Sequence, residues 1–388
     1  MRARCILKVV VNKNGILNSN LRMLKDNFDR KSWRPVRLKY RSKNWLTLTR
    51  GGSNVVLVDQ YNIFIEELFL LRNPRFKFEK IDIVALNRFK LSFLKNNPAE
   101  LSGGWFYFPW LNQLVHFLPE IEHLELRTGR NRNLITSDEQ SIYYKATVAV
   151  LGMSVGSHVA LTLVMTGGAK KIILADPDTI SGSNLNRIRV GFHQIGLSKV
   201  RSVARQIFEI NPYSQIDIYD DGVTDKNLIK IFNGKNKPAL VIEEMDNPYF
   251  KIKTRELARR KGVPVIMAAD NGDGVNVDVE RYDLNKKLPI LHGLIPNLES
   301  KMFKSVDPKD LVGIMAKMAG SDYASKRMLK SVALVGKKLY SWPQLGTAAT
   351  LCGSVLANLG RRIILDEKIN SGRFIVNELT MFKMIKRS

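Results

Sequence analysis

The sequence predicts an α/β protein with a Rossmann-like, doubly wound and mostly parallel sheet. An α+β region precedes this sheet, and a helical and strand extension follows it. From residue 146 onward, short apolar runs alternate with amphipathic segments, which is typical of buried parallel strands joined by helices. A glycine-containing loop follows the first apolar run directly, where a dinucleotide-binding sheet turns into its first helix.

The region over residues 1–125 is predicted to form an α+β domain of unknown role. Apolar runs favour strands at Cys5–Val11 and Val55–Val58, whereas Ile63–Leu71 fits either an amphipathic helix or a buried strand. A dense aromatic block bounded by Gly and Pro predicts β structure over 101–125. Trp33, Tyr40 and Trp45 lie among basic residues; such aromatics either stack on nucleic-acid bases or pack in a core.

Beyond residue 145 the order of strands and helices can be predicted one by one. Gly167-Gly168 closes the first helix, and Asn211-Pro212 ends a later one. Strands are expected at Ala146–Leu151, Lys171–Ala175, Ile216–Tyr219, Ala239–Ile242 and Val263–Ala268, with a closing strand at Arg373–Met381. Helices are expected at 157–168, 198–210, 248–261 and 345–365.

The chain has 388 residues and a formal net charge of +25, and the excess lies at its two ends. Residues 1–50 hold 14 Lys and Arg against 2 acids, and residues 301–388 hold 16 against 6, whereas residues 101–250 are balanced at 15 each. Basic ends attract nucleic acid or an acidic partner, or they form an ordinary solvated surface. Binding of tRNA is therefore one open expectation.

Apolar runs fall well short of the ~20 residues that a membrane span needs, so we expect a cytoplasmic protein without membrane contact. Its two cysteines, Cys5 and Cys352, exclude a four-cysteine zinc site and a disulfide framework, and no zinc is expected.

Two features indicate a nucleotide. The loop Gly152-Met153-Ser154-Val155-Gly156-Ser157 joins a strand to a helix, where glycines admit a phosphate and the helix N-terminus attracts it. It departs from G-x-G-x-x-G, because serine holds the second glycine position and the loop is one residue shorter. Asp176 ends the next strand, where a carboxylate accepts hydrogen bonds from a ribose.

The residues after Asp176 narrow the range of reactions that the sequence is compatible with. The chain continues through Pro177-Asp178, Asn184-Leu185-Asn186-Arg187, Ser198-Lys199 and Glu244-Met245-Asp246-Asn247. In this order the motifs over about 127–282 resemble the ThiF/MoeB-type adenylyltransferases, which are related to ubiquitin-activating enzymes. The resemblance implies an adenylation domain over 126–285 and a C-terminal extension over 286–388 that completes it.

The resemblance implies that ATP and Mg²⁺ bind, that a carboxylate is adenylated and that pyrophosphate leaves. It assigns Arg187 and Lys199 to the phosphates and Asp246 to Mg²⁺. This fits the chemistry, because cations must offset several negative charges when a carboxylate approaches a polyphosphate. By the same resemblance the nucleotide-binding residues are Gly152, Ser154, Gly156, Asp176, Asp178, Asn184, Arg187 and Lys199.

Upstream, Arg130-Asn131-Arg132 resembles a segment from which an arginine of this family reaches the nucleotide of a neighbouring protomer. The resemblance therefore implies a homodimer in which Arg130 or Arg132 acts in catalysis. The alternative for both arginines is a capping or solvated basic turn.

Two departures from the family limit the function. Cys352 is the only cysteine after Asp246, and it lies on an apolar helix, so we expect a packing residue and no catalytic cysteine. The segment Ala269-Asp270-Asn271-Gly272-Asp273-Gly274 either shapes a substrate channel or is only a turn. His158, His193 and His292 lack metal-ligand spacing and receive no role.

The sequence therefore predicts an ATP-dependent adenylyltransferase whose substrate is the C-terminus of a ubiquitin-like or sulfur-carrier protein, or of a peptide. A tRNA-modifying enzyme that activates a nucleoside carboxylate and a non-catalytic nucleotide-binding scaffold are the alternatives. A nicotinamide dehydrogenase has no use for Asn184, Arg187 and Lys199.

Overall fold

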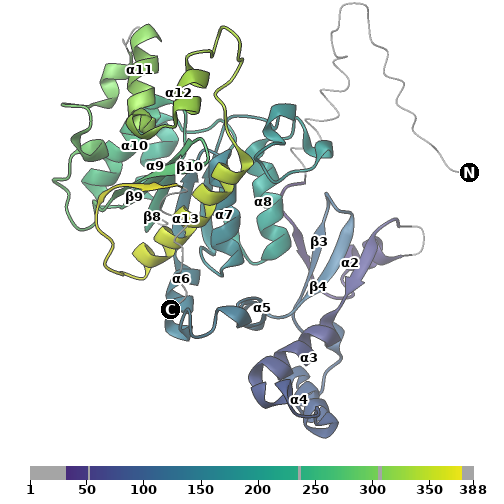
Figure 1. Ribbon diagram of the computed structural model, residues 1–388. Coiled ribbons are helices and arrows are strands. Elements are labelled where there is room, and N and C mark those ends of the chain that lie inside the picture. The colour runs from purple at the N-terminus through teal and green to yellow at the C-terminus, as the bar shows by residue number, and fades with distance from the viewer. Residues whose placement is uncertain (1–31, 51–52, 235–236, 305–307, 378–388) are drawn as a thin grey trace, which may run out of the picture.

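Two sheets organise the chain, a small one near the N-terminus and a larger one that follows it (Figure 1). The computed structural model describes residues 32–50, 53–234, 237–304 and 308–377. The expected strand at Cys5–Val11 and the end of the closing strand beyond residue 377 lie outside these residues.

The small sheet has four strands in the order β1-β3-β4-β2, with β2 and β4 parallel and the other pairs antiparallel. Its core is aromatic: Tyr40 and Trp45 pack around buried Trp105, so both belong to a core and not to an exposed stacking surface. The strands are β1 (Val36–Leu38), β2 (Val56–Asp59), β3 (Gly104–Phe108) and β4 (Gln113–Phe117), and the helices are α2 (Lys43–Thr49), α3 (Tyr61–Arg72) and α4 (Ile83–Leu94).

The structure answers two questions that the sequence left about residues 63–71 and 101–125. Ile63–Leu71 is part of a helix and not a strand. The β structure predicted over 101–125 stops at Phe117, because α5 (Glu120–Arg127) starts directly after Pro119. Proline suits a helix start, and Glu120 and Glu122 in the first turn interact favourably with the helix dipole, so a helix replaces the end of the predicted strand.

The larger sheet has seven strands in the order β11-β10-β9-β8-β5-β6-β7. Strands β5 to β9 are parallel, and the last two are antiparallel, so the predicted Rossmann-like, mostly parallel sheet is confirmed. They are β5 (Thr147–Leu151), β6 (Lys171–Ala175), β7 (Gln215–Tyr219), β8 (Leu240–Glu243), β9 (Val265–Asn271), β10 (Gly274–Glu280) and β11 (Gly372–Val376).

Helices cover both faces of this sheet (Figure 1). Apolar residues of α7, α8 and α13 share one core with Val148 and Val150, whereas α9 and α10 pack on the opposite side against Ala149 and Leu151. The helices are α6 (Ser137–Lys145), α7 (Val155–Met165), α8 (Lys199–Ile210), α9 (Asp225–Asn233), α10 (Pro248–Lys261), α11 (Pro308–Ala319), α12 (Lys326–Val332) and α13 (Gly346–Ile364).

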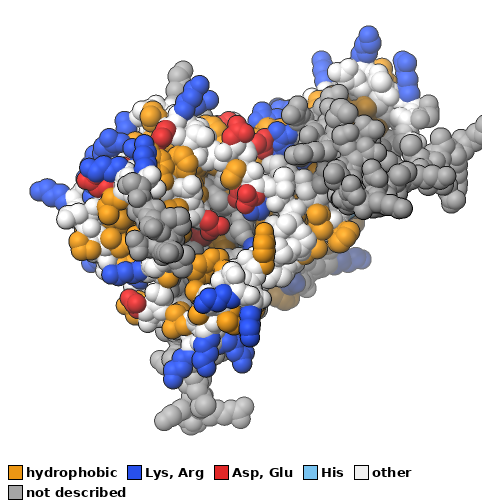
Figure 2. Space-filling view, turned by 90° about the horizontal axis from the view of Figure 1, so that it is seen from above, with side chains coloured by type: hydrophobic (Ala, Val, Ile, Leu, Met, Phe, Trp, Pro, Cys, Tyr) orange, Lys and Arg blue, Asp and Glu red, His pale blue; other side chains and the backbone are white. Residues whose placement is uncertain are grey.

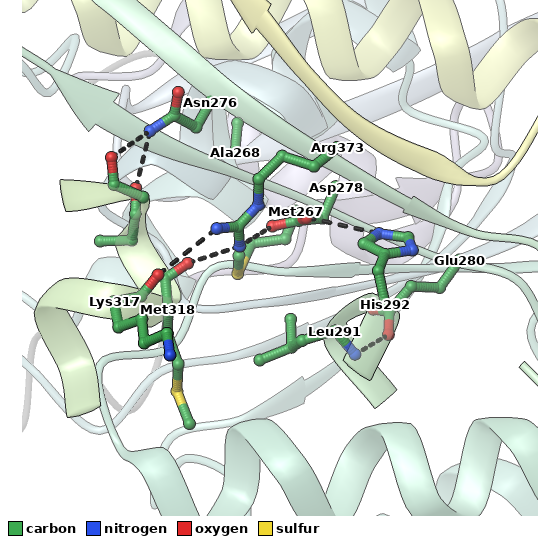
Figure 3. A network of polar contacts seen from close by, with 12 residues as sticks. Met267, Ala268, Asn276, Asp278, Glu280, Leu291, His292, Lys317, Met318 and Arg373 are labelled. Carbon is green, nitrogen blue, oxygen red and sulfur yellow. Dashed lines mark hydrogen bonds and ion pairs between the residues drawn. The ribbon is translucent and has the colours of Figure 1, made fainter. Parts of the chain in front are cut away.

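A row of polar side chains on one face of β10 holds the segment between β10 and α13 (Figure 3). Asn276 donates to the carbonyls of Ala319, the last residue of α11, and Gly320. Asp278 binds Arg373 of β11 through both carboxylate oxygens at 2.8 Å, and Arg373 donates to the carbonyl of Met318. These contacts close the end of α11 onto the sheet and bury the carboxylate.

The two sheets share a core, since Phe106 and Phe108 of β3 pack with residues of α7 and α8. Arg34 donates to the carbonyl of Ile216 at 2.8 Å across this junction. A cavity of about 370 Å³ lies here, at the amino ends of β5, β6 and β7, and therefore far from the loop that begins at Gly152.

Of the helices that the structure describes, none is both long and apolar enough to span a bilayer.

Candidate nucleotide site

The glycine-containing loop lies at the carboxyl ends of β5 and β8, between which the strand order of the sheet reverses. In open α/β sheets, ligands bind at such a switch point. Gly152 has φ = 96°, and a Cβ atom there would overlap the backbone of Glu244, just past the end of β8. Only glycine fits this turn, which brings the end of β8 directly against the loop.

The rest of the loop leaves the start of α7 open. A Cβ on Gly156 would lie 2.9 Å from the side chain of Val150, so glycine allows close packing of α7 on β5. Ser154 precedes the first helical residue, and its side chain does not cap the helix. The free N–H groups of this N-terminus therefore face the carboxyl edge of the sheet, where an anion is favoured.

Asp176, Asp178 and Lys199 meet beside this loop. Oδ2 of buried Asp176 accepts from the backbone N–H of Met153 at 2.6 Å, and Oδ1 accepts from that of Asp178 at 2.8 Å. The buried ammonium of Lys199 lies 2.7 Å from Asp178 and 3.8 Å from Asp176. Burial raises the pKa of Asp176, whereas Lys199 and the two N–H groups oppose that shift.

Arg187 reaches the same loop from the segment between β6 and α8. Its Nε donates to Ser154 Oγ at 3.2 Å, so the serine that replaces the second motif glycine contacts the predicted phosphate-binding arginine. Burial lowers the pKa of the Arg187 guanidinium, and Asp270 and Asp246 oppose this shift. Asn184 is buried, and its Oδ1 accepts from the N–H of Ser181, so it stabilises the turn that carries Arg187.

Asp246 and Asp270 complete the edge on the side of β8 and β9. Asp246 is exposed, and none of the described residues forms a hydrogen bond with its carboxylate. Asp270 accepts from Gln344 Nε2 at 3.0 Å and from Cys352 Sγ at 3.3 Å, and burial raises its pKa. The segment 269–274 is thus strand up to Asn271 and a tight turn beyond it, with one carboxylate directed at the site.

Cys352 lies inside α13 and is fully buried. Burial together with Asp270 and Glu244 raises the pKa of its thiol well above the usual range. A thiol in these surroundings stays protonated and is a poor nucleophile. Its burial agrees with the packing role expected from the sequence.

Arg130 and Arg132 are not brought to this site. Arg132 donates to Glu125 at 2.8 Å and to the carbonyl of Leu71 at 3.1 Å, and Asn131 between them donates to Thr166 just beyond α7. The candidate site lies at the N-terminus of α7, so its 11 residues, about 16 Å of helix, separate the two places.

Three residues at the site were missed or left without a role. His158 of α7 donates to the backbone carbonyl of Arg187, Gln344 contacts Asp270, and Glu244 accepts from Ala268 N–H. Their partners are distant in sequence, so spacing carries no signal for the first two. Glu244 stood in the quoted motif and could have been singled out as a second acid at the end of a buried strand.

Comparison with known proteins decides the family. A family model described as the ThiF family matches residues 128–386. The chain belongs to the ThiF family. The matched range extends beyond the expected 127–282 and includes β11, which the C-terminal extension contributes to the larger sheet of this chain.

Relatives of this ThiF-family chain are mostly longer than the aligned region. "Uncharacterized protein MT1398" of Mycobacterium tuberculosis is 36% identical over 278 residues, 72% of this chain and 38% of the relative. The tRNA threonylcarbamoyladenosine dehydratase 2 of Saccharomyces cerevisiae is 25% identical over 230 residues, 56% of this chain and 51% of the relative. The chain thus spans about half or less of both.

Among solved structures, E. coli tRNA N6-threonylcarbamoyladenosine dehydratase in complex with AMP gives a TM-score of 0.45 at 19% identity. The match covers 62% of this chain and 95% of that one.

Proposed function

We propose that this ThiF-family protein is an ATP-dependent adenylyltransferase that activates a carboxylate as an acyl-adenylate and releases pyrophosphate. One observation carries the proposal: Asp176, Lys199, Arg187 and Asp246 all lie at the carboxyl edge of one sheet, around a loop with an open helix N-terminus. A ribose-binding acid, two cations and a further carboxylate are what Mg-ATP and an incoming carboxylate require.

Each group has a distinct task in this proposal. Asp176 accepts from the ribose hydroxyls, and the α7 N-terminus with Gly152 and Gly156 receives the phosphates. Arg187 offers a planar fork for phosphate oxygens, whereas Lys199 offers a point charge. To do so, Lys199 exchanges its contact with Asp178 for the nucleotide.

Asp246 is the candidate ligand for Mg²⁺, and the residues present fit this ion. Proteins hold Mg²⁺ through one or two carboxylates, while phosphates and water supply the remaining oxygens, and Asp246 is exposed without a competing hydrogen bond from the described residues. When bound, the ion would offset the negative charge of the phosphates. Asp270 is already bonded to Gln344 and Cys352, so we assign it to the site wall.

For the substrate we propose the C-terminal carboxylate of a small protein or peptide. A nucleoside carboxylate on tRNA is the second candidate. The yeast relative, named a tRNA threonylcarbamoyladenosine dehydratase, and the basic ends favour it. No catalytic cysteine enters either version, so the acyl group passes directly to an outside nucleophile.

Pyrophosphate exchange tests the reaction. The protein is incubated with Mg-ATP, labelled pyrophosphate and either a peptide library with free C-termini or bulk tRNA. Exchange that depends on one of these, and that Lys199→Ala reduces by about 10²–10³-fold, supports adenylation, since one charge-stabilising donor contributes that much. Tight ATP binding without exchange against either substrate class would favour a scaffold.

Nucleotide preference is a separate prediction. Because Asp176 suits a ribose while Lys199 and Arg187 suit a triphosphate, Mg-ATP is expected to raise the melting temperature more than NAD does. Differential scanning fluorimetry with each nucleotide measures this. Stabilisation by NAD alone would contradict the adenylation proposal.

A further inference from the structure

The loop that carries Arg187 is held from two helices that lie far apart in the sequence. From α7, His158 Nε2 donates to the backbone carbonyl of Arg187. Just before α13, the backbone carbonyl of Gln344 accepts from Asn186 Nδ2 at 2.8 Å, and a Cβ on Gly346, the first residue of α13, would overlap the carbonyl of Asn186. The backbone on either side of the arginine is therefore fixed independently of its side chain.

His158 has little freedom to do anything else. It is 2% exposed, and a Cβ on Gly353 of α13 would overlap its own Cβ, so α13 packs directly against it. Because a carbonyl only accepts, the proton must be on Nε2, which leaves Nδ1 as a bare acceptor. Nδ1 is buried and has no hydrogen-bond partner among the described residues.

This arrangement is a poor one for stability alone. A buried acceptor without a partner costs free energy, and an apolar side chain of similar size would avoid that cost. Burial and nearby Arg189 lower the pKa of His158, so the ring stays neutral and keeps the tautomer that its donor role needs. Its one satisfied atom is the one that contacts Arg187.

We propose that His158 is a positioning residue for nucleotide binding: its Nε2–H fixes the backbone of Arg187 so that the guanidinium is held beside the phosphate loop. The inference rests on the proposed function, and it adds a residue to which spacing assigned no role. Its effect passes through Arg187, so removing that side chain should remove the benefit of the histidine.

The test compares His158→Leu, which removes the donor, with His158→Gln, which keeps an N–H at similar reach. His123→Leu is the matched control, because His123 is a half-buried histidine whose Nε2 also bonds a backbone carbonyl, that of Ile210, away from the site. Hydrogen exchange of peptides covering 182–190 is measured in nucleotide-free protein. ATP affinity is measured by calorimetry, and the melting temperature of each variant is recorded.

For His158→Leu we expect faster exchange over 182–190 and ATP affinity weaker by about tenfold, the factor of one hydrogen bond. Its melting temperature should fall by no more than about 2 °C, because loss of the unpaired acceptor offsets loss of the bond. His158→Gln should restore most of the affinity. His123→Leu should leave 182–190 and ATP affinity unchanged.

A double-mutant cycle with Arg187→Ala decides whether the effect passes through the arginine. In that background His158→Leu should change ATP affinity by less than about twofold. An undiminished effect there, or unchanged exchange over 182–190, would overturn the positioning role. If the wild-type protein binds no ATP, the proposed function fails, while the exchange and melting data still decide whether His158 fixes this loop.

Discussion

A thiol beside the proposed site of acyl activation is a candidate nucleophile, but the surroundings of Cys352 favour a role as a hydrogen-bond donor. Its Sγ lies 3.3 Å from Asp270 Oδ1, in a helix that packs on α7. Through this contact the thiol of Cys352 donates a hydrogen bond to Asp270, whose pKa burial raises. Cys352 therefore supports the wall of the site.

Substitution of Cys352 separates the two roles. Cys352→Ser keeps a donor for Asp270 at similar size, so acyl-adenylate formation should stay within about threefold of the wild type, as expected for a small change in one buried contact. Pyrophosphate exchange measures this. A reductant-sensitive thioester on Cys352, detected by mass spectrometry of the acylated protein, would show the opposite.

The site residues that can be predicted from the sequence are those at the ends of strands and helices. Gly152 and Asp176 directly follow apolar strands, and Lys199 begins a helix, so the edge where they meet could be inferred from the order of elements. The contacts of His158 with Arg187 and of Gln344 with Asn186 join residues 29 and 158 positions apart, and nothing in local spacing points to them. Tertiary packing alone creates them.

The fold likewise contains strands that the sequence predicts and strands that it does not. β6 occupies its predicted range because the apolar residues after Lys171 are stable only inside a covered parallel sheet. β10 was not predicted: its valines alternate with Asn276, Asp278 and Glu280, a pattern of a half-exposed strand, yet both faces are buried. The polar face is buried because partners such as Arg255 and Arg373 arrive from elsewhere in the chain.

At the scale of elements, one acidic residue that directly follows β8 and contacts β9 destabilises the folded state when it is charged. Glu244 accepts from the N–H of Ala268 at 2.8 Å, and burial raises the pKa of its carboxyl group well above the usual range. The folded state therefore retains a proton that the unfolded chain has lost. Stability consequently falls as pH rises above the unfolded pKa.

Glu244→Gln should remove this pH dependence. The amide oxygen still accepts from Ala268 and carries no charge, so the free energy of unfolding should exceed that of the wild type at pH 7.5. The gain should vanish near pH 4, where the unfolded carboxyl group is also protonated; each pKa unit corresponds to about 1.4 kcal/mol. Urea unfolding at both pH values measures the difference. A variant less stable than the wild type at pH 7.5 would contradict the assignment.

At the scale of the whole molecule, the position of Arg130 and Arg132 bears on assembly. Both lie beyond the C-terminal end of α7, and Arg132 bonds Glu125 and Leu71 of its own chain. In a dimer, an arginine on this surface would reach a neighbour's nucleotide more easily than its own. We therefore keep the prediction of a homodimer with shared sites.

Mixing two inactive variants tests whether each site is shared between two protomers. Arg130→Ala/Arg132→Ala protein combined with Lys199→Ala protein should regain activity in pyrophosphate exchange, because each hybrid dimer holds one intact site. The matched control mixes Arg187→Ala with Lys199→Ala, two changes within one site, and should stay inactive. Light scattering that finds an active monomer would exclude the idea, as would absence of rescue when subunit exchange is demonstrated.

Charge is distributed unevenly over the surface, with many Lys and Arg side chains near the outline of the face in Figure 2 and several acids further in. A carboxylate-bearing partner approaching this face meets attraction first at the rim.

The close packing of α13 on His158 also has a consequence for synthesis. Gly353 contacts a residue about two hundred positions earlier, and such distant pairs form late in folding. The ribosome releases the glycine loop and Asp176 long before α13 and β11, so a nascent chain has an interval in which one side of α7 is uncovered. During that interval, the apolar residues of α7 that later pack against α13 remain exposed. Truncation within α13 would leave this apolar surface of α7 exposed permanently. The expected product aggregates and is sensitive to proteases, in contrast to a folded protein with reduced activity.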